Sequence, residues 1–206
     1  MTTATEPVRL TRAQIKEAGE VLAKASHEDP LAVWLVPEEA KRSRLQRWYF
    51  PAIIRYGLLY GEVYGTAGLV AGAAIWLPPG ETDVTTIRLI RVGFLAAPLR
   101  LGPAAFVRSM TVADHHGKLH KRDMNVPHWY LWEMGVAPPR QGQGIGGALM
   151  QPILNRADAE GLHCYLETQN ERNPAFYEKH GFEVVVEGEL PRGGPHFWTM
   201  KREPRG

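Results

Sequence analysis

Residues 129–147 read WYLWEMGVAPPRQGQGIGG, and this stretch decides the fold. Its first half, Tyr130 to Val136, is aromatic and apolar and is bounded by prolines, which is typical of a strand. Four glycines follow within six positions, and the apolar residues after them recur every four positions, as on one face of a helix. A strand followed by a glycine-rich helix start predicts a diphosphate site, because the first helical N–H groups lack partners inside the helix.

The same glycines match the dinucleotide-binding pattern G-x-G-x-x-G, from Gly142 to Gly147, with Glu167 about 20 residues further on. A dinucleotide fold runs its first strand almost directly into the first glycine, whereas five residues separate Val136 from Gly142 here. We also expect no second mononucleotide-binding half in the residues that follow. We therefore interpret this match as accidental.

A fuller pattern, VAPPRQGQGIG from Val136 to Gly146, resembles the first signature of the Gcn5-related N-acetyltransferase (GNAT) superfamily. Residues 170–182, NERNPAFYEKHGF, resemble its second signature. A lone glycine motif is weak, but two motifs in order and at the family's spacing are specific. The resemblance is close over about residues 125–202, which look most like the branch that contains puromycin N-acetyltransferase. The first half of the chain resembles that branch only loosely.

The resemblance implies a mixed α/β fold with a mostly antiparallel sheet of six to seven strands and helices on both faces. One parallel pair, residues 129–136 and 162–168, would splay around an acetyl-CoA cleft. A helix over residues 144–160 would join them by a right-handed crossover. We expect one acetyltransferase domain over residues 1–206, with residues 81–122 as a helical insertion or acceptor-side lid.

Local signals predict the remaining elements. Thr11 and Gln14 form a capping box for a helix to about Ser26, and Asp29-Pro30 should end that helical region. Pro51 should bend or divide a second helix that Pro37 opens. We also expect strands at 58–67 and 69–77, a hairpin of 182–190 with 196–201, and frayed residues at 202–206.

The resemblance assigns coenzyme A to three groups of residues. Backbone amides at the glycine-rich turn would bind the pyrophosphate: Gln141, Gly142, Gln143, Gly144, Ile145, Gly146 and Gly147. The pantetheine arm would pair with the strand at Met134, Gly135 and Val136, with the Val136 N–H near the thioester oxygen. Asn173 and Tyr177, four apart on one helix face, would reach the arm and the sulfur. Asn170 is the alternative to Asn173, whose plain structural role is an N-cap.

Acyl transfer from a thioester to an amine needs an oriented amine, a proton acceptor and a proton for the leaving thiolate. The resemblance makes Tyr177 the acid. Glu133 is our candidate base or water-relay anchor, although strict alternation would turn it away from Tyr130 unless a bulge intervenes. His120 and His128 are alternatives, and an enzyme without a dedicated base could take an already neutral amine.

We interpret two other groups of residues as structural and not functional. Cys164 lies inside a predicted strand and should be a buried thiol. His116 and His120 are spaced i, i+4 near Asp114, but no metalloenzyme pattern accompanies them, so we expect no metal.

Composition limits the class of protein. The 206 residues are 44% hydrophobic with a formal net charge of +2, which is too balanced for a dedicated nucleic-acid binder. The N-terminal residues lack a signal-peptide core, and arginines and prolines interrupt the apolar stretch 89–107. We expect a cytoplasmic protein without nucleic-acid or membrane partners. The aromatic residues of the first half would suit an acceptor pocket or allow a homodimer.

These observations favour an acetyl-CoA-dependent N-acetyltransferase that acts on a primary amine of a small molecule, antibiotic-like amines included, by direct attack in a ternary complex. A protein lysine or N-terminal acetyltransferase on the same fold is the first alternative, and it would need an open, peptide-wide groove. A coenzyme A-binding sensor without turnover is the second, and the undecided base is its only support.

Overall fold

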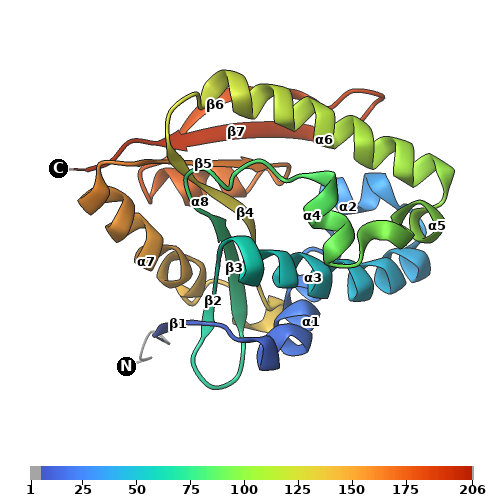
Figure 1. The fold of residues 1–206 in the computed structure, drawn as a ribbon, viewed down its shortest axis with the longest axis horizontal. Helices are drawn as coiled ribbons and strands as arrows, with labels where there is room; N and C mark the ends of the chain where they lie inside the picture. The colour runs from blue at the N-terminus through green and yellow to red at the C-terminus, as the bar shows by residue number, and fades with distance from the viewer. Residues whose placement is uncertain (1–5, 206) are drawn as a thin grey trace.

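A seven-stranded sheet forms the centre of the computed structural model, which describes residues 6–205 (Figure 1). The strand order is β1-β2-β3-β4-β5-β7-β6. Neighbouring strands are antiparallel except β4 and β5, which are parallel. The predicted mixed, mostly antiparallel sheet with one parallel pair is therefore confirmed.

The strands are β1 (Pro7–Arg9), β2 (Glu62–Thr66), β3 (Gly72–Leu77), β4 (His128–Val136), β5 (His163–Thr168), β6 (Glu183–Glu189) and β7 (His196–Arg202). The α-helices are α1 (Ile15–Ala25), α2 (Pro30–Leu35), α3 (Glu39–Tyr60), α4 (Thr86–Arg91), α5 (Ala97–Leu101), α6 (Pro103–Asp123), α7 (Ile145–Glu160) and α8 (Asn173–Glu178). Short 3-10 turns are η1 (Arg12–Gln14), η2 (Phe94–Ala96) and η3 (Pro138–Arg140).

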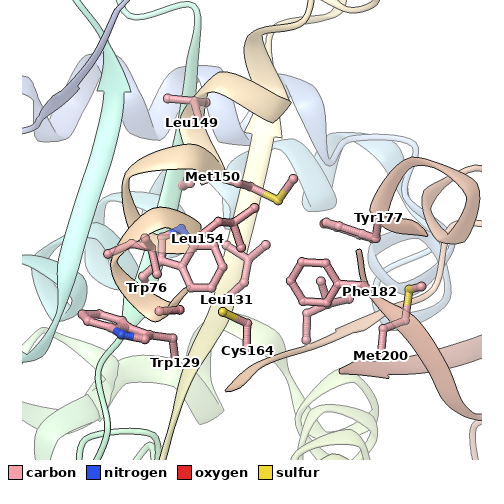
Figure 2. Packing of buried hydrophobic residues seen from close by; sticks show 14 of the residues in the cluster. Trp76, Trp129, Leu131, Leu149, Met150, Leu154, Cys164, Tyr177, Phe182 and Met200 are labelled. Carbon is pink, nitrogen blue, oxygen red and sulfur yellow. The ribbon is translucent and has the colours of Figure 1, made fainter. Parts of the chain in front are cut away.

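Helices cover both faces of the sheet. On one face α7 packs over the middle strands, and its Leu149 and Ile153 join Trp76 and Trp129 in a buried cluster (Figure 2). On the other face α1 and α3 cover β2 to β4 through a second apolar cluster. Helix α6 lies along the β6–β7 hairpin, where Val112 packs with residues of that hairpin (Figure 1).

Helix α2 begins where we expected helical structure to stop. The Asp29 carboxylate accepts a hydrogen bond from the Leu31 N–H at 2.9 Å, and Pro30 occupies the first turn. These are the preferences of an N-cap and of the first helical position. Helix α1 ends at Ala25, as predicted, but Asp-Pro is also a start signal, and the prediction did not include α2.

Helix α3 runs without a break through Pro51 and Gly57 to Tyr60, so residues 58–60 are helical and not part of a strand. A Cβ on Gly19 of α1 would lie 2.8 Å from the Pro51 ring. Helices α1 and α3 therefore approach closely at this proline. We infer that burial of the helix against α1 and the sheet outweighs the lost backbone hydrogen bond.

Residues 81–122 contain helices, as predicted, and two prolines lie among them. Pro98 and Pro103 lie in the first turns of α5 and α6. Proline is tolerated there because the missing N–H would have had no partner inside the helix. The helical region is therefore divided near these prolines, and each proline lies at the start of the helix that follows.

Residues 202–205 are held in place, contrary to the predicted fraying of 202–206, whose last residue lies outside the described residues. The Arg202 side chain is 3% exposed and donates to both carboxylate oxygens of Asp158, each at 2.7 Å. It also donates to the His180 carbonyl at 3.0 Å, and the Arg205 N–H donates to Asp158 at 2.8 Å. This end of the chain is therefore bound to α7.

Candidate active site

Strands β4 and β5 pair over three residues, His128–Tyr130 with His163–Tyr165. Beyond Tyr130 and Tyr165 the ladder ends, although β4 continues to Val136 and β5 to Thr168. The facing edges beyond this point carry backbone groups that the sheet leaves unpaired. The predicted splayed parallel pair is present, and we call these facing edges the open edge.

The backbone of β4 turns alternate residues toward the open edge. The Ala137 N–H donates to the Ala71 carbonyl on the β3 side at 2.8 Å. In an antiparallel ladder, alternate residues bond to the same neighbour. Gly135 therefore also turns its backbone groups to β3, whereas Met134 and Val136 turn theirs to the open edge.

Two glycines shape the loop that precedes α7. Gly142 and Gly144 have φ angles of 73° and 77°, which side chains of L-residues disfavour. Among the described residues no side chain caps α7, and Ala148 is bonded back to Gly144. The N–H groups of residues 145–147 thus point out of the helix start, where a phosphate would accept from them.

The other two glycines serve packing between helices. A Cβ on Gly146 would lie 3.1 Å from the ring of Phe176, and one on Gly147 would lie 2.7 Å from the ring of His180. Both rings come from α8 and the turn after it. Gly146 and Gly147 therefore let that segment approach α7, a packing role that the glycine pattern in the sequence did not reveal.

A β-bulge turns Glu133 toward the face covered by α1 and α3. Ile75 pairs with Glu133 but Trp76 pairs with Leu131, so Trp132 is one extra residue in β4. Leu131 packs with Met134 under α7 although they are three residues apart. Glu133 accordingly shares a face with Tyr130, which strict alternation would not allow.

Burial raises the pKa of Glu133 to about 8, and the negative charge of Asp29 adds to the shift. Burial and then the charge of Glu133 raise the pKa of Tyr177 and of Tyr49 well above the usual tyrosine value. Glu133 therefore lies close enough to Tyr177 and to Tyr49 for its charge to act on both. Sequence reasoning missed Asp29 because it lies more than 100 residues before Glu133.

Tyr177 is 7% exposed, and its ring points from α8 toward the cluster under α7, on the side of Met150 (Figure 2). No described residue forms a hydrogen bond with its hydroxyl. Because its pKa is raised, the phenol keeps its proton at neutral pH, and because it has no partner among the described residues, it is free to donate.

Asn173 is the first residue of α8, and Arg172 holds the N-cap position, so the N-cap role is wrong for Asn173. Its side-chain amide donates to the Thr168 hydroxyl at 2.7 Å, at the end of β5. The Asn170 side chain instead accepts from the Arg172 N–H at 3.1 Å. Of the two asparagines, Asn173 is therefore the one directed at the open edge.

The structure also shows where the other residues considered in the sequence analysis lie. Cys164 is fully buried, and burial raises its thiol pKa to about 12, which fits a structural role. Within residues 6–205, no group of three or more metal-ligating side chains is gathered. His120 on α6 lies beside Glu167, and His128 at the start of β4 contacts His120. Glu167 was set aside with the accidental fingerprint, yet the alternation of β5 places it on the face of Glu133.

Comparison with known proteins agrees with this geometry. The model of the Acetyltransferase (GNAT) family matches residues 92–182. An uncharacterised N-acetyltransferase of Schizosaccharomyces pombe is 30% identical over 182 residues, which cover 84% of this chain and 72% of that protein. The chain therefore belongs to the GNAT acetyltransferase family. Its class is that of the acetyl-CoA-dependent acyltransferases.

Two solved structures share the fold. A histone acetyltransferase HPA2 and related acetyltransferase from Corynebacterium glutamicum has a TM-score of 0.66 and 22% identity, covering 99% of this chain and 98% of its own. The polyamine N-acetyltransferase of Drosophila melanogaster has a TM-score of 0.62 and 13% identity, covering 96% and 100%. At these identities the likeness concerns the fold. None of the helices described here is long and apolar enough to span a membrane.

Proposed function

We propose that the protein transfers the acetyl group of acetyl-CoA to the primary amine of a small molecule. One observation supports a small acceptor over a protein. Phe94, in the insertion, lies against Trp48 and Tyr49 with ring centroids 5.0 and 5.7 Å apart. Tyr49 is a neighbour of Glu133, so the insertion covers the acceptor side where a peptide would need an open groove.

The residues present fit acetyl-CoA, which when bound supplies the activated acetyl thioester. The N–H groups at the start of α7, from Gln141 to Gly147, would hold the pyrophosphate. Backbone groups of Met134 and Val136 face the open edge, where an extended arm would pair as a strand does. The Val136 carbonyl accepts from the Gln141 side chain at 3.0 Å, which leaves the Val136 N–H for the ligand.

Three side chains would handle the arm and the protons. Asn173 would contact the pantetheine arm at the end of β5. Glu133 would take the proton that the amine loses, since a base works best when its pKa lies near the working pH. Tyr177 would protonate the leaving thiolate, because its phenol keeps its proton at neutral pH.

The test is release of free thiol from acetyl-CoA in the presence of arylalkylamines, polyamines, aminoglycosides and puromycin. We expect thiol release with at least one primary amine and none with its N,N-dimethyl counterpart, which cannot form a stable amide. Faster turnover of a peptide with a free α-amine or lysine would overturn the small-molecule proposal. Coenzyme A binding without turnover of any amine would favour a sensor.

A further inference from the structure

A cluster of buried titratable side chains under α6 has no part in the reaction proposed above. At its centre, the Glu167 side chain on β5 is 5% exposed. Its Oε2 accepts from the Tyr130 hydroxyl at 2.7 Å. Its Oε1 is buried with no hydrogen-bond partner among the described residues, and it lies 4.0 Å from Nδ1 of His120 on α6.

Hydrogen bonds fix the tautomers of the two histidines. Nδ1 of His128 lies 2.7 Å from the Val126 carbonyl, which can only accept, so that nitrogen carries a proton. Neutral His128 then has its lone pair at Nε2, 2.7 Å from Nε2 of His120. His120 must donate there, which leaves a lone pair on its Nδ1, facing Glu167. Burial lowers the pKa of both histidines, that of His120 to about 4, so both are neutral.

When Glu167 is ionised, as it is at a pH above about 8, its Oε1 and the Nδ1 of neutral His120 are two acceptors that face each other across 4.0 Å. This is too far for a direct hydrogen bond, and neither atom has a proton to donate. A nitrogen about 2.8 Å from each acceptor would meet them at an angle of roughly 90°, which suits two N–H bonds of one ammonium group. The rings of Tyr165 and Tyr130 lie 4.4 and 4.5 Å from the ring of His120, so the surroundings of the two acceptors are aromatic.

The position of Glu167 relates this pair to the proposed reaction. The last β4–β5 pair is Tyr130 with Tyr165. Glu167 lies two ladder steps beyond it on β5, and Glu133, after the bulge residue, lies two steps beyond it on β4. The two carboxyl groups therefore stand at one level on either side of the open edge, on the same face.

We propose that Glu167 Oε1 and His120 Nδ1 bind the nitrogen of the acceptor amine, by accepting two of its N–H bonds. This inference rests on the proposed function, and it makes α6 of the insertion part of the acceptor site.

The protons balance in this arrangement. An acceptor that arrives as an ammonium ion gives one proton to Glu167 and becomes a nucleophile. When the C–N bond forms, the nitrogen gives its second proton to Glu133. As the C–S bond breaks, the thiolate takes the proton of Tyr177, which Glu133 then restores. Glu167 releases its proton to solvent, so one proton is produced for each amide formed.

The titratable groups near Glu167 are Tyr130 on β4, Tyr165 on β5, and His120 and Asp123 on α6, and His128 at the start of β4 contacts His120. Burial raises the pKa of Glu167 to about 8; the hydrogen bond from Tyr130 opposes the shift and the charge of Asp123 adds to it. A carboxyl group of this pKa exchanges a proton readily with an amine.

Kinetics of Glu167→Gln and His120→Phe test the proposal. We expect the acceptor KM to rise about 10- to 100-fold in Glu167→Gln, and about tenfold in His120→Phe, with the KM for acetyl-CoA unchanged. His120→Phe keeps a ring on Tyr165, which protects the packing. His116→Phe, one helical turn away on α6, is the matched control and should keep the wild-type acceptor KM. An unchanged acceptor KM in Glu167→Gln would overturn the proposal.

A second readout does not depend on turnover. In protein labelled with ¹⁵N-histidine, we expect the proton of His120 on Nε2 and that of His128 on Nδ1. Methylammonium should shift the Nδ1 resonance of His120, and tetramethylammonium, which has no N–H, should not. The opposite tautomers, or an equal response to the two cations, would overturn the proposal. If no amine is acetylated but this selectivity holds, the proposed function fails and the ammonium site stands.

Discussion

The two sides of the open edge are built in different ways. The proposed coenzyme side is one continuous segment, from β4 through α7 and β5 to α8, and it offers mainly backbone N–H groups and conformations that need glycine. The proposed acceptor side offers side chains: Asp29 before α2, Tyr49 on α3, His120 on α6 and Glu167 on β5.

This difference has consequences for mutation. A backbone site tolerates changes of most side chains but not changes of φ or of close packing. A side-chain site depends on charges and protons that single substitutions remove. We therefore expect substitutions on the coenzyme side to be most harmful at its glycines and at the residues that hold α7 in place. On the acceptor side, substitutions of the carboxyl groups should be the most harmful.

The largest effect should come from Tyr177, where the two sides meet. We expect Tyr177→Phe to lower kcat about 10²- to 10³-fold at an unchanged KM for acetyl-CoA, because a general acid contributes on this order. The ring still packs against Phe182, so the melting temperature should hold. Tyr64→Phe, which removes a hydroxyl bonded to Glu62 on β2, is the matched control for steady-state thiol release. If Tyr177→Phe had the same kcat as the wild-type protein, Tyr177 would not be the general acid.

Glu133 should set the pH dependence of kcat. Its ionised form is the base and its pKa is raised to about 8, so activity should be lost as pH falls through about 8 and level off above it. Glu133→Gln should lower the plateau about 100-fold and leave only the part of this limb that the ionisation of Glu167 contributes. Asp29→Asn keeps a good N-cap but removes a negative charge, so it should move the midpoint of the limb to lower pH. A midpoint that stays in place would show that Asp29 does not act on the base.

The ion pair that holds α7 to the end of the chain should contribute to the free energy of unfolding. Asp158→Asn leaves the buried Arg202 without its ionic partner, and we expect the free energy of unfolding to fall by about 2–3 kcal/mol. The control is Glu160→Gln, which breaks the exposed pair with Arg156 and should cost less than about 0.5 kcal/mol.

The hydrogen bonds from Arg202 lower the pKa of Asp158 below its unfolded value. The stabilisation is therefore present above the unfolded pKa and is lost as pH falls through the folded pKa. Urea titrations at neutral and acidic pH should show the difference between wild type and Asp158→Asn shrinking in acid. A constant difference would contradict the ionic explanation.

The smallest expected changes in the free energy of unfolding concern two glycines whose surroundings differ. A Cβ on Gly135 would lie 2.8 Å from the Cβ of Ala25 on α1, so Gly135→Ala should lower the free energy of unfolding by about 1–2 kcal/mol. Gly117 on α6 has open space around the same position, and Gly117→Ala should stabilise by about 0.5–1 kcal/mol, because alanine favours the helix. Urea unfolding measures both, and equal signs would refute the packing argument.

Much of the coenzyme side could be predicted because its signals are local. The strand, the glycine turn and the start of α7 follow from periodicity and from residues that allow positive φ. The same locality explains the errors. Asp-Pro can end one helix or begin another, and a proline can interrupt a helix or be tolerated inside it. Packing against the rest of the fold decides between these outcomes at Asp29-Pro30 and at Pro51.

By itself the sequence determined the central strand, the parallel crossover and the order of the two signatures, since neighbouring residues suffice for helix starts, turns and alternation. The tertiary structure decided which side chains meet at the acceptor side. The bulge at Trp132 turns Glu133 to the face of Tyr130, and the hydrogen bonds of His128 fix the proton of His120. Residues far apart in the chain produce these effects, and no local pattern encodes the distances between them.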